Sequence, residues 1–389
     1  MPGYEVINND EFKEISLIFK KSKTLFRMGF ENQRKNIFKV KELESNFAKK
    51  FHAKYSLAVS SGTAALRIAL STINLKPGDE VITQSFTFVA TVEAIVESRA
   101  IPVCTEIDET LNMDPNDLLK KITKKTKAVI VVHMLGVPVQ VDAIKKICKK
   151  YKLILIEDTA WGCGGKYKNK YLGTWGDIGA FSFDFAKTIT TGEGGMLLFK
   201  NKKQFLAAKA WHDHGHENNP KVPRWEDTRK SSGFNFRMTE MQGAVGVAQL
   251  KKLDYIIKKQ RLNHDKIWNK IKHLPFIKKR VYPRNSEITA DALIIISKSK
   301  KIAKKIRLEL NKRGLFTKIL PEASTWHFAA FWKHIITIKK IKNKKLTDSF
   351  PKSKKILEKC VSIPIVVKMK KEVPNQILTS FEKSAYHKK

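Results

Sequence analysis

Three short motifs contain side chains that could together hold a phosphorylated aldehyde. The turn Ser60–Thr63 follows an apolar run and precedes a helical pattern, so its hydroxyls and N–H groups would meet the positive end of a helix, which suits a phosphate. Asp158 ends the apolar run LILIED, at the carboxyl end of a predicted strand, where ligands bind in open α/β sheets. Lys187 follows FSFDFA, and desolvation there would lower its pKa and free its amine for Schiff-base chemistry.

Each motif also has an ordinary structural interpretation. Serine and threonine commonly cap helices, Asp158 could cap the next helix, and one lysine means little in a chain with 75 lysines and arginines. Together, however, the motifs match the needs of pyridoxal 5′-phosphate: a phosphate cup, a carboxylate at the pyridinium nitrogen and a lysine for the aldehyde. The sequence therefore favours this cofactor, with the carboxylate keeping the ring nitrogen protonated and the lysine moving the proton.

The elements that must position these residues alternate between strands and helices. Near-continuous apolar runs at 127–134 and 153–158 are typical of strands covered on both faces. Alternation at this spacing predicts an α/β fold with a mainly parallel, doubly wound sheet. The other strand candidates are 56–61, 80–84, 101–107, 177–183 and 194–199, and the helix candidates are 64–73, 87–98, 114–124 and 141–152.

The chain is expected to divide into two units. A polar segment, 212–232, is predicted to be a long loop, and a helix that begins near Thr239 leads into a lysine-rich second unit, where 290–297 is a strand candidate. We therefore expect a large cofactor-binding domain over residues 1–250, with an N-terminal lead, and a smaller C-terminal α+β domain over 251–389.

The composition excludes several classes of protein. With 42% hydrophobic and 10% aromatic residues, the 389-residue chain can bury a core, which excludes a mainly disordered protein. No apolar run approaches the roughly 20 residues that span a bilayer, and the polar, acidic start MPGYEVINNDEFKE differs from a signal or transit peptide. The four cysteines are widely spaced and form no CxxC pair, so we expect free thiols in a reducing cytoplasm.

The net charge of +38 has three interpretations. It can reflect a compositional preference for lysine, isoleucine and asparagine, a positive field that attracts an anionic substrate, or a nucleic-acid surface. Lysine far outnumbers arginine, and the charge is spread without aromatic interleaving or a groove-reading motif. We therefore expect a small-molecule substrate and no nucleic-acid partner.

A known enzyme family shows the same motifs in the same order. The chain resembles the DegT/DnrJ/EryC1/StrS sugar aminotransferases over roughly residues 1–260, in the runs SSGTAAL, GDEVITQSFTFVATVEAI, VIVVHMLGVPVQVDAI, LIEDTAW, DIGAFSFDFAKTITTGEGGM and GFNFRMTEMQGAVGVAQLKKLD. The resemblance implies an aspartate-aminotransferase-like pyridoxal-phosphate enzyme of fold type I that moves the amino group of L-glutamate to an oxidised sugar. Related dehydratases have His where this chain has Lys187, which argues against their chemistry. A non-catalytic regulator on the same fold is the alternative from a different class.

The resemblance also implies residue roles. Lys187 would form the Schiff base with the cofactor, Asp158 would pair with its pyridinium nitrogen, and Phe88 would stack on its ring. Trp161 stands where relatives have His or Gln, and because an indole cannot accept a hydrogen bond, the contact to the ring oxygen is left open. Asn235 resembles the residue that reaches the phosphate across a dimer interface, which implies a homodimer with shared active sites. The phosphate would be held by Gly62, Thr63 and Ser182.

Three segments resemble a narrower subgroup of the family. Residues 2–5, 212–229 and 320–332 are similar to transaminases that make 8-amino-3,8-dideoxy-manno-octulosonate, a lipopolysaccharide sugar. The acceptor would then be the acidic sugar 8-oxo-3,8-dideoxy-manno-octulosonate, and the alternative is a nucleotide-linked 3- or 4-keto sugar. The candidate residues for binding an acidic sugar, each with a structural alternative, are His214, Arg224, Arg229, Arg237 and His327.

The alternating histidines His212, His214 and His216 could suggest a metal site. Extended backbone would place them on one side, but no carboxylate-histidine signature accompanies them. We therefore expect a polar substrate loop here and no metal.

Overall fold

The structure is a computed structural model that describes residues 2–219, 221–335 and 345–385. Seven strands form its central sheet, in the order β1-β9-β8-β5-β4-β2-β3. The neighbours from β8 to β3 pair in parallel, and β9 runs antiparallel to both β1 and β8, which confirms the expected mainly parallel sheet. The strands are β1 Tyr55–Val59, β2 Glu80–Gln84, β3 Ile101–Thr105, β4 Thr126–Val132, β5 Ile154–Asp158, β8 Ile178–Ser182 and β9 Gly195–Phe199.

Helices cover both faces of this sheet, as near-continuous apolar strands require. On β5, Leu155 packs into a cluster with α7, whereas its neighbour Ile156 packs into the cluster that contains α4 and α5. Because side chains alternate along a strand, Glu157 follows Leu155 and Asp158 follows Ile156. The helices of this part are α1 Pro2–Glu5, α2 Asn9–Leu17, α3 Lys39–Phe51, α4 Gly62–Ser71, α5 Val89–Glu97, α6 Pro115–Lys121, α7 Val141–Lys150 and α8 Lys202–Trp211.

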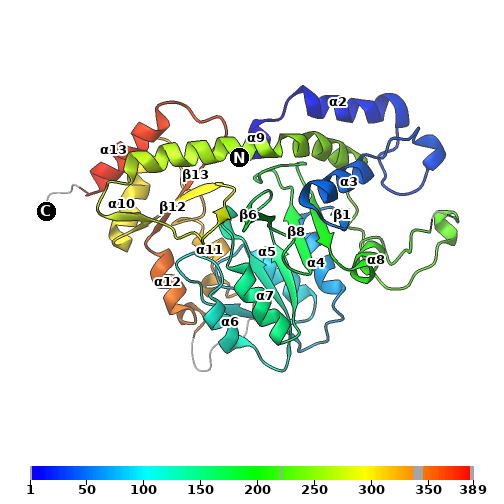
Figure 1. The fold of residues 1–389 in the computed structure, drawn as a ribbon, viewed down its shortest axis with the longest axis horizontal. Helices are drawn as coiled ribbons and strands as arrows, with labels where there is room; N and C mark the ends of the chain where they lie inside the picture. Colours follow the sequence, from blue (N-terminus) through cyan, green and yellow to red (C-terminus); the bar gives the residue numbers. More distant parts are fainter. Residues whose placement is uncertain (1, 220, 336–344, 386–389) are drawn as a thin grey trace.

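A single long helix, α9 (Glu240–Ile271), runs across the width of the molecule (Figure 1). It begins at a capping box in which the Thr239 side chain accepts from the Gln242 N–H, and the Gln242 side chain accepts from the Thr239 N–H. The helix packs against α2, α3 and α13. The domain boundary expected at residue 250 therefore lies inside a continuous helix, and the strands of the second sheet all follow that helix.

The C-terminal part is a smaller α+β unit, as expected. Its three-stranded antiparallel sheet has the order β10-β12-β13 and packs against α10 and α13. A minor sheet joins β11 to the β6–β7 hairpin of the larger part. These elements are β6 Lys166–Tyr167, β7 Lys170–Tyr171, β10 Ile277–Lys279, β11 Ser286–Glu287, β12 Ala292–Ser297, α10 Lys300–Asn311, α11 Ser324–His327, α12 Pro351–Leu357, β13 Cys360–Pro364 and α13 Val373–Ala385.

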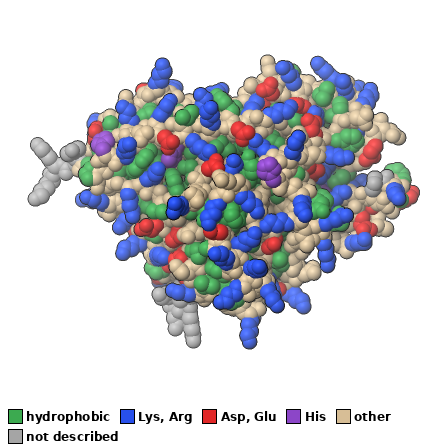
Figure 2. Space-filling view, in the orientation of Figure 1, with side chains coloured by type: hydrophobic (Ala, Val, Ile, Leu, Met, Phe, Trp, Pro, Cys, Tyr) green, Lys and Arg blue, Asp and Glu red, His purple; other side chains and the backbone are tan. Residues whose placement is uncertain are grey.

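Charge is spread over the surface. On the face drawn in Figure 2, lysine and arginine side chains lie scattered among acidic and apolar ones. All four cysteines are buried and free, and burial raises the pKa of each thiol to about 12, so they are unreactive thiols. Within the described ranges, every helix is too short or too polar to cross a membrane.

Candidate active site

A cavity of about 270 Å³ lies at the carboxyl ends of β5 and β8. This is the edge at which open α/β sheets bind their ligands. Strand ends, the first turns of α4 and α5, and one segment of the C-terminal part supply its walls. The lining includes Ser61, Gly62, Thr63, Thr87, Phe88, Thr91, Asp158, Trp161, Ser182, Asp184, Lys187, Glu193 and His327. The structure thus brings together every cofactor residue expected from the sequence except Asn235.

One end of the cavity suits a phosphate. Ser61 caps α4, with its side chain accepting from the Ala64 N–H at 3.0 Å, so the helix begins at the cavity wall. Gly62 lies so close to β8 that a Cβ there would be 2.7 Å from the Cβ of Ser182. The close contact leaves backbone N–H groups and the Ser182 hydroxyl at a positive helix end, which is a ready anion site.

A buried carboxylate, Asp158, lies at the end of β5. Its Oδ2 accepts from Thr91 Oγ1 at 2.9 Å, and its Oδ1 accepts from the Ala160 N–H at 3.1 Å. Thr91 also contacts Thr87 Oγ1 at 2.8 Å, which orients its hydroxyl toward the carboxylate. Burial raises the pKa of Asp158 because the charged form loses solvent, and the two hydrogen bonds oppose this only in part. A cationic partner in the cavity would stabilise the charged form of this carboxylate.

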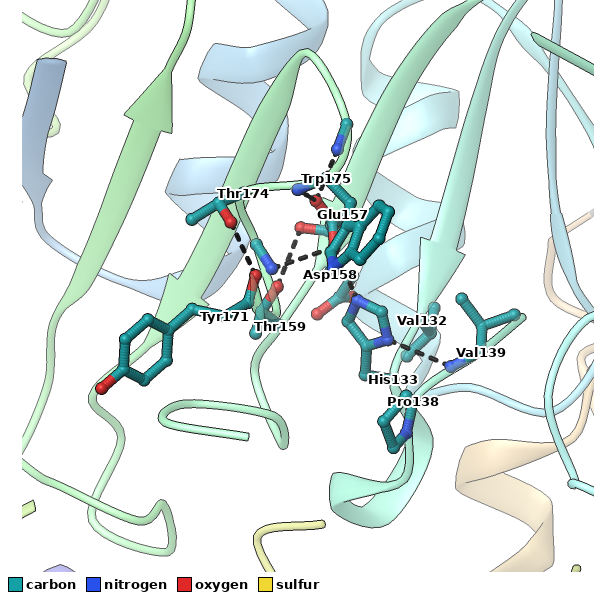
Figure 3. Close-up of polar contacts among 12 residues, drawn as sticks. Val132, His133, Pro138, Val139, Glu157, Asp158, Thr159, Tyr171, Thr174 and Trp175 are labelled. Atoms are coloured by element: carbon teal, nitrogen blue, oxygen red, sulfur yellow. Dashed lines mark hydrogen bonds and ion pairs between the residues drawn. The ribbon is translucent and has the colours of Figure 1, made fainter. Parts of the chain in front are cut away.

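A second carboxylate, Glu157, fixes β5 from the opposite face of the sheet. It accepts from His133 Nε2 at 2.9 Å and from the N–H groups of Gly173, Trp175 and Gly176 at 2.7–2.9 Å. Figure 3 shows the ring of His133 between Glu157 and the backbone of Val139. These donors lower the pKa of Glu157 although it is fully buried. The network sets the position of the strand end that carries the neighbouring Asp158.

Lys187 lies in the loop after β8, with its Nζ 3.4 Å from the centroid of the Trp161 ring. Its backbone is held at both groups: its N–H donates to Asp184 O at 3.0 Å, and its carbonyl accepts from Gly3 N at 3.2 Å. The N-terminal lead therefore contacts the lysine loop directly. Burial, followed by the charge of Lys318, lowers the pKa of Lys187 to about 8. An amine with this pKa is available as a base and nucleophile near neutral pH.

The C-terminal part supplies the remaining wall. Phe328 forms a β-bridge with Phe86, and Thr87 N donates to His327 O at 2.9 Å. The His327 ring lies 5.4 Å from that of Phe88, whose other neighbour is Trp326 at 6.5 Å. Segment 320–332, singled out in the sequence as a substrate segment, thus reaches the cavity through His327. Burial lowers the pKa of His327 to about 4, so its ring is neutral at ordinary pH.

The other substrate candidates do not line this cavity within one chain. Arg224 donates to both Asp213 oxygens at 2.6 and 2.8 Å, and Arg237 donates to the same carboxylate. Arg229 donates to His216 Nε2 at 3.3 Å, and His214 is exposed at a left-handed turn. Their roles toward a sugar stay predictions. Pro220, inside the predicted substrate segment 212–229, lies outside the described residues.

Asn235 is also outside the cavity. It is exposed and forms a β-bridge with Asp213, next to Phe236, whose carbonyl accepts from Ser60 N at 2.9 Å. His212 and His216 make protein contacts: His212 Nδ1 donates to Lys209 O at 2.5 Å, and His216 Nδ1 contacts Asp227 Oδ2 at 3.1 Å. The three histidines therefore do not converge: His212 contacts the end of α8, His216 contacts Asp227, and His214 is exposed.

Sequence reasoning missed three participants. Glu157 had a signal, because a carboxylate inside an apolar strand must be buried with partners. Thr91 lies within the helix predicted over 87–98, but its contact with Asp158 depends on how α5 packs beside β5. Lys318 carries no local signal, since it is one of many lysines and reaches Trp161 only through the fold.

The fit to pyridoxal 5′-phosphate is specific. A buried carboxylate with room for a cation, a phosphate-sized cradle at Gly62 and Ser182, and a buried amine share one cavity. On this fold, the combination defines a pyridoxal-phosphate protein of fold type I. The chain belongs to the DegT/DnrJ/EryC1/StrS aminotransferase family, whose profile matches residues 30–382. Family membership confirms the expected fold class and cofactor.

Relatives and solved structures agree with this assignment. The chain is 41% identical over 223 residues to GDP-perosamine synthase of Escherichia coli O157:H7, a match that covers 57% of this chain and 60% of the synthase. It is 34% identical over 348 residues to an uncharacterized protein of Methanocaldococcus jannaschii, covering 85% and 86%. The X-ray structure of an aminotransferase from Psychrobacter cryohalolentis superposes with a TM-score of 0.82 at 26% identity, covering 97% and 96%.

Proposed function

We propose that this protein is a pyridoxal-phosphate-dependent aminotransferase that moves the amino group of L-glutamate to an oxidised sugar. The observation that carries the proposal is the position of Lys187, whose buried amine lies in one cavity with Asp158 and Ser182. Retention of this lysine argues against the dehydratase chemistry of related proteins and against a non-catalytic regulator.

Each group in the cavity has a task. Ser182 and the N–H groups at Gly62 and Thr63 bind and orient the phosphate. Asp158, held by Thr91, keeps a proton on the ring nitrogen. When bound, the cofactor supplies an electron sink for the bond broken at the donor's Cα.

Lys187 moves the proton in this scheme. In the glutamate half-reaction its amine would take the Cα proton and pass it to the former aldehyde carbon of the cofactor, and in the sugar half-reaction it would carry a proton from that carbon to the carbon that is aminated. Its pKa of about 8 lies close to neutral pH, which suits a group that must both accept and release a proton. Phe88 and Trp161 line the cavity and would restrict water around this transfer.

We further propose that the active unit is a homodimer with shared sites. Asn235 is exposed and, like Arg224, Arg229 and Arg237, does not line the cavity of its own chain. An exposed Trp225 in the same segment, 212–237, gives it apolar surface that a partner would cover. In a dimer, Asn235 would serve the partner's phosphate.

For the acceptor we propose the nucleotide-free acidic sugar 8-oxo-3,8-dideoxy-manno-octulosonate. Support comes from the segment 320–332, which resembles transaminases of that sugar and which places His327 in the cavity wall. Nothing about the +38 net charge decides the matter, because a positive field attracts nucleotide sugars equally.

A nucleotide-linked 3- or 4-keto sugar is the second candidate. The observation that favours it is the 41% identity to GDP-perosamine synthase, although that match covers 57% of this chain. The two candidates differ in the anion they present: a carboxylate on the sugar itself, or a diphosphate remote from the reacting carbon.

The deciding experiment incubates the protein with pyridoxal 5′-phosphate, L-glutamate and a panel of oxidised sugars. The panel contains 8-oxo-3,8-dideoxy-manno-octulosonate and GDP- and UDP-linked keto sugars, and mass spectrometry follows amination and 2-oxoglutarate release. Faster turnover of the octulosonate supports the proposed acceptor. Faster turnover of a nucleotide sugar replaces it with the second candidate, and amination of neither sugar class would refute the sugar aminotransferase proposal.

A further inference from the structure

Two lysines lie against one indole ring in the cavity wall. Lys187 Nζ is 3.4 Å from the centroid of the Trp161 ring, and Lys318 Nζ is 4.8 Å from the same centroid. Lys318 also donates to Asp291 Oδ2 at 2.6 Å. The two lysines come from different parts of the chain, one after β8 and the other between α10 and β13.

The position of Lys318 is fixed. Its backbone N–H donates to Ser362 O on β13 at 2.7 Å, and its side chain is only 18% exposed. Asp291, with a side chain 2% exposed, precedes β12, and its carbonyl accepts from Ile365 N at 3.1 Å. Both members of this ion pair are therefore held by the small antiparallel sheet, and the Lys318 ammonium cannot easily leave the indole.

The charges around Lys187 come from several elements. Lys318 opposes a positive charge on Lys187, whereas Asp291, Asp184 and Asp158 favour one. His327 also lies nearby, but burial lowers its pKa to about 4, so it is neutral and adds no charge near pH 7. Among these charges, Lys318 has the largest effect, and with burial it lowers the pKa of Lys187 to about 8.

We propose that Lys318 is a positioning residue for amino transfer: its ammonium group, fixed by Asp291 against Trp161, disfavours a second ammonium group on Lys187 and keeps that amine able to accept a proton. The inference rests on the proposed aminotransferase function. It also gives a role to Trp161, whose flat ring lets two lysines approach one site from separate elements. A ring face attracts a cation, so the indole helps to hold the Lys318 ammonium beside Lys187, which is the more buried of the two amines.

The first test measures the ionisation of Lys187 directly. Protein loaded with pyridoxamine 5′-phosphate, the amine form of the cofactor, has Lys187 free, and trace acetylation with acetic anhydride followed by peptide mass spectrometry gives its reactivity from pH 6 to 10. For Lys318→Met we expect the pH midpoint of Lys187 acetylation to rise by about one unit, which is the size of shift that one nearby like charge causes. Lys318→Arg should keep the original midpoint, because the positive charge is retained.

A matched control is available at Lys168. Its Nζ donates to Asp142 Oδ2 at 2.6 Å and lies 5.3 Å from the Tyr167 ring, so it repeats the lysine–carboxylate–aromatic arrangement away from the cavity. Lys168→Met should leave the Lys187 midpoint unchanged. Lys318→Gln, which can still donate to Asp291, serves as the second neutral variant should Lys318→Met fail to fold.

The second test follows the glutamate half-reaction through the absorbance of the cofactor, without any sugar. At pH values below the Lys187 midpoints of both proteins, a rise of one pH unit in the midpoint lowers the fraction of Lys187 that is a free amine about tenfold. Lys318→Met should therefore be roughly tenfold slower than the wild type at pH 7 and equal to it at pH 10. The proposal would be overturned if Lys318→Met left the midpoint of Lys187 acetylation unchanged. It would also be overturned if the variant slowed the glutamate half-reaction by the same factor at every pH. Because neither test uses a sugar, failure here is distinct from failure to aminate any sugar.

Discussion

Gly62 and Ser182 meet across the phosphate end of the cavity so closely that a Cβ on Gly62 would lie 2.7 Å from the Cβ of Ser182. Real Cβ contacts are longer, so α4 can begin beside β8 only because residue 62 is glycine. We expect Gly62→Ala to lower the free energy of unfolding by about 1–3 kcal/mol through overpacking and to weaken cofactor binding. Chemical denaturation and fluorescence titration with pyridoxal 5′-phosphate measure the two effects.

A second substitution separates packing from binding. In the double variant Gly62→Ala/Ser182→Gly the clashing Cβ is gone, so part of the lost stability should return, whereas cofactor affinity should stay low because the serine hydroxyl is missing. If the single variant binds the cofactor as tightly as the wild type, this end of the cavity is not the phosphate site.

Lys187 and Lys200 provide an internal comparison for the Schiff-base lysine. Burial lowers the pKa of both amines to about 8, but Lys200 donates to Trp175 O and does not line the cavity. We expect borohydride reduction of the protein loaded with pyridoxal 5′-phosphate to attach the cofactor to Lys187 alone. Lys187→Ala should reduce amination by at least about 10²-fold, and Lys200→Ala should leave it unchanged. Peptide mapping that finds the cofactor on another lysine would contradict the assignment.

Asp158 should affect the protein in opposite directions with and without the cofactor. Its pKa is raised by burial, so its stabilising contribution is present at low pH and is lost as pH rises and the carboxyl ionises. At pH 8, Asp158→Asn should therefore raise the melting temperature of the cofactor-free protein. The same change should weaken cofactor binding roughly tenfold or more, because a charged hydrogen bond is lost.

The pH dependence supplies the control for this prediction. Because burial raises the pKa of Asp158, lowering the pH protonates it more readily in the folded protein, so the stability difference between Asp158→Asn and the cofactor-free wild type should shrink as the pH falls. Thermal melts across pH 5–8, with and without pyridoxal 5′-phosphate, measure both effects. If the Asp158→Asn variant melts at a lower temperature than the wild type at pH 8 without cofactor, the hydrogen bonds of Asp158 outweigh the cost of burying its charge, and the prediction is wrong.

The residue pattern predicted that Asp158 ends a strand and that Gly62 follows one, whereas Ser182 was expected from the family resemblance. Asp158 and Ser182 end β5 and β8, and Gly62 follows β1, so the parallel topology carries all three to one edge of the sheet. The sequence pattern located these strands because each contains a short, mainly apolar run. The start of α9 near Thr239 was also predictable, since the capping box is a local signal.

Contacts made between distant segments could not be derived in this way. Lys318 reaches Trp161 only because the small sheet packs where it does, and no spacing in the sequence records that. Likewise, Arg224 and Arg237 looked free to bind an acidic sugar, but both donate to the buried Asp213 of their own loop. The domain boundary at 250 was placed by composition, inside a helix that the sequence predicts from about Thr239 through Lys258 and beyond and that ends at Ile271 in the structure.

The proposed shared active site can be tested with any sugar that the enzyme aminates, whichever sugar class that proves to be. Asn235→Ala and Lys187→Ala should each be inactive alone, because one removes the proposed phosphate contact and the other the reactive amine. Mixed dimers carry one site free of both substitutions and should recover partial activity, at most half per dimer. Native mass spectrometry verifies that mixed dimers form, and no recovery in their presence would exclude the exchange of Asn235 between chains.

His327 offers the last prediction, because its ring lines the cavity while its ionisation is suppressed. Its Nδ1 donates to Ala323 O at 2.9 Å, which leaves Nε2 as an acceptor that can meet a sugar hydroxyl. We expect His327→Phe to raise KM for the sugar about tenfold, the cost of one lost hydrogen bond at an otherwise buried hydroxyl, and to leave the glutamate half-reaction unchanged. Trp326→Phe, at the exposed neighbouring position, is the control for disturbance of α11.

Because the pKa of His327 is about 4, the ratio of the wild-type KM to that of His327→Phe should stay constant between pH 6 and 8. A ratio that changes across this range would show that His327 titrates there and binds the sugar as a cation.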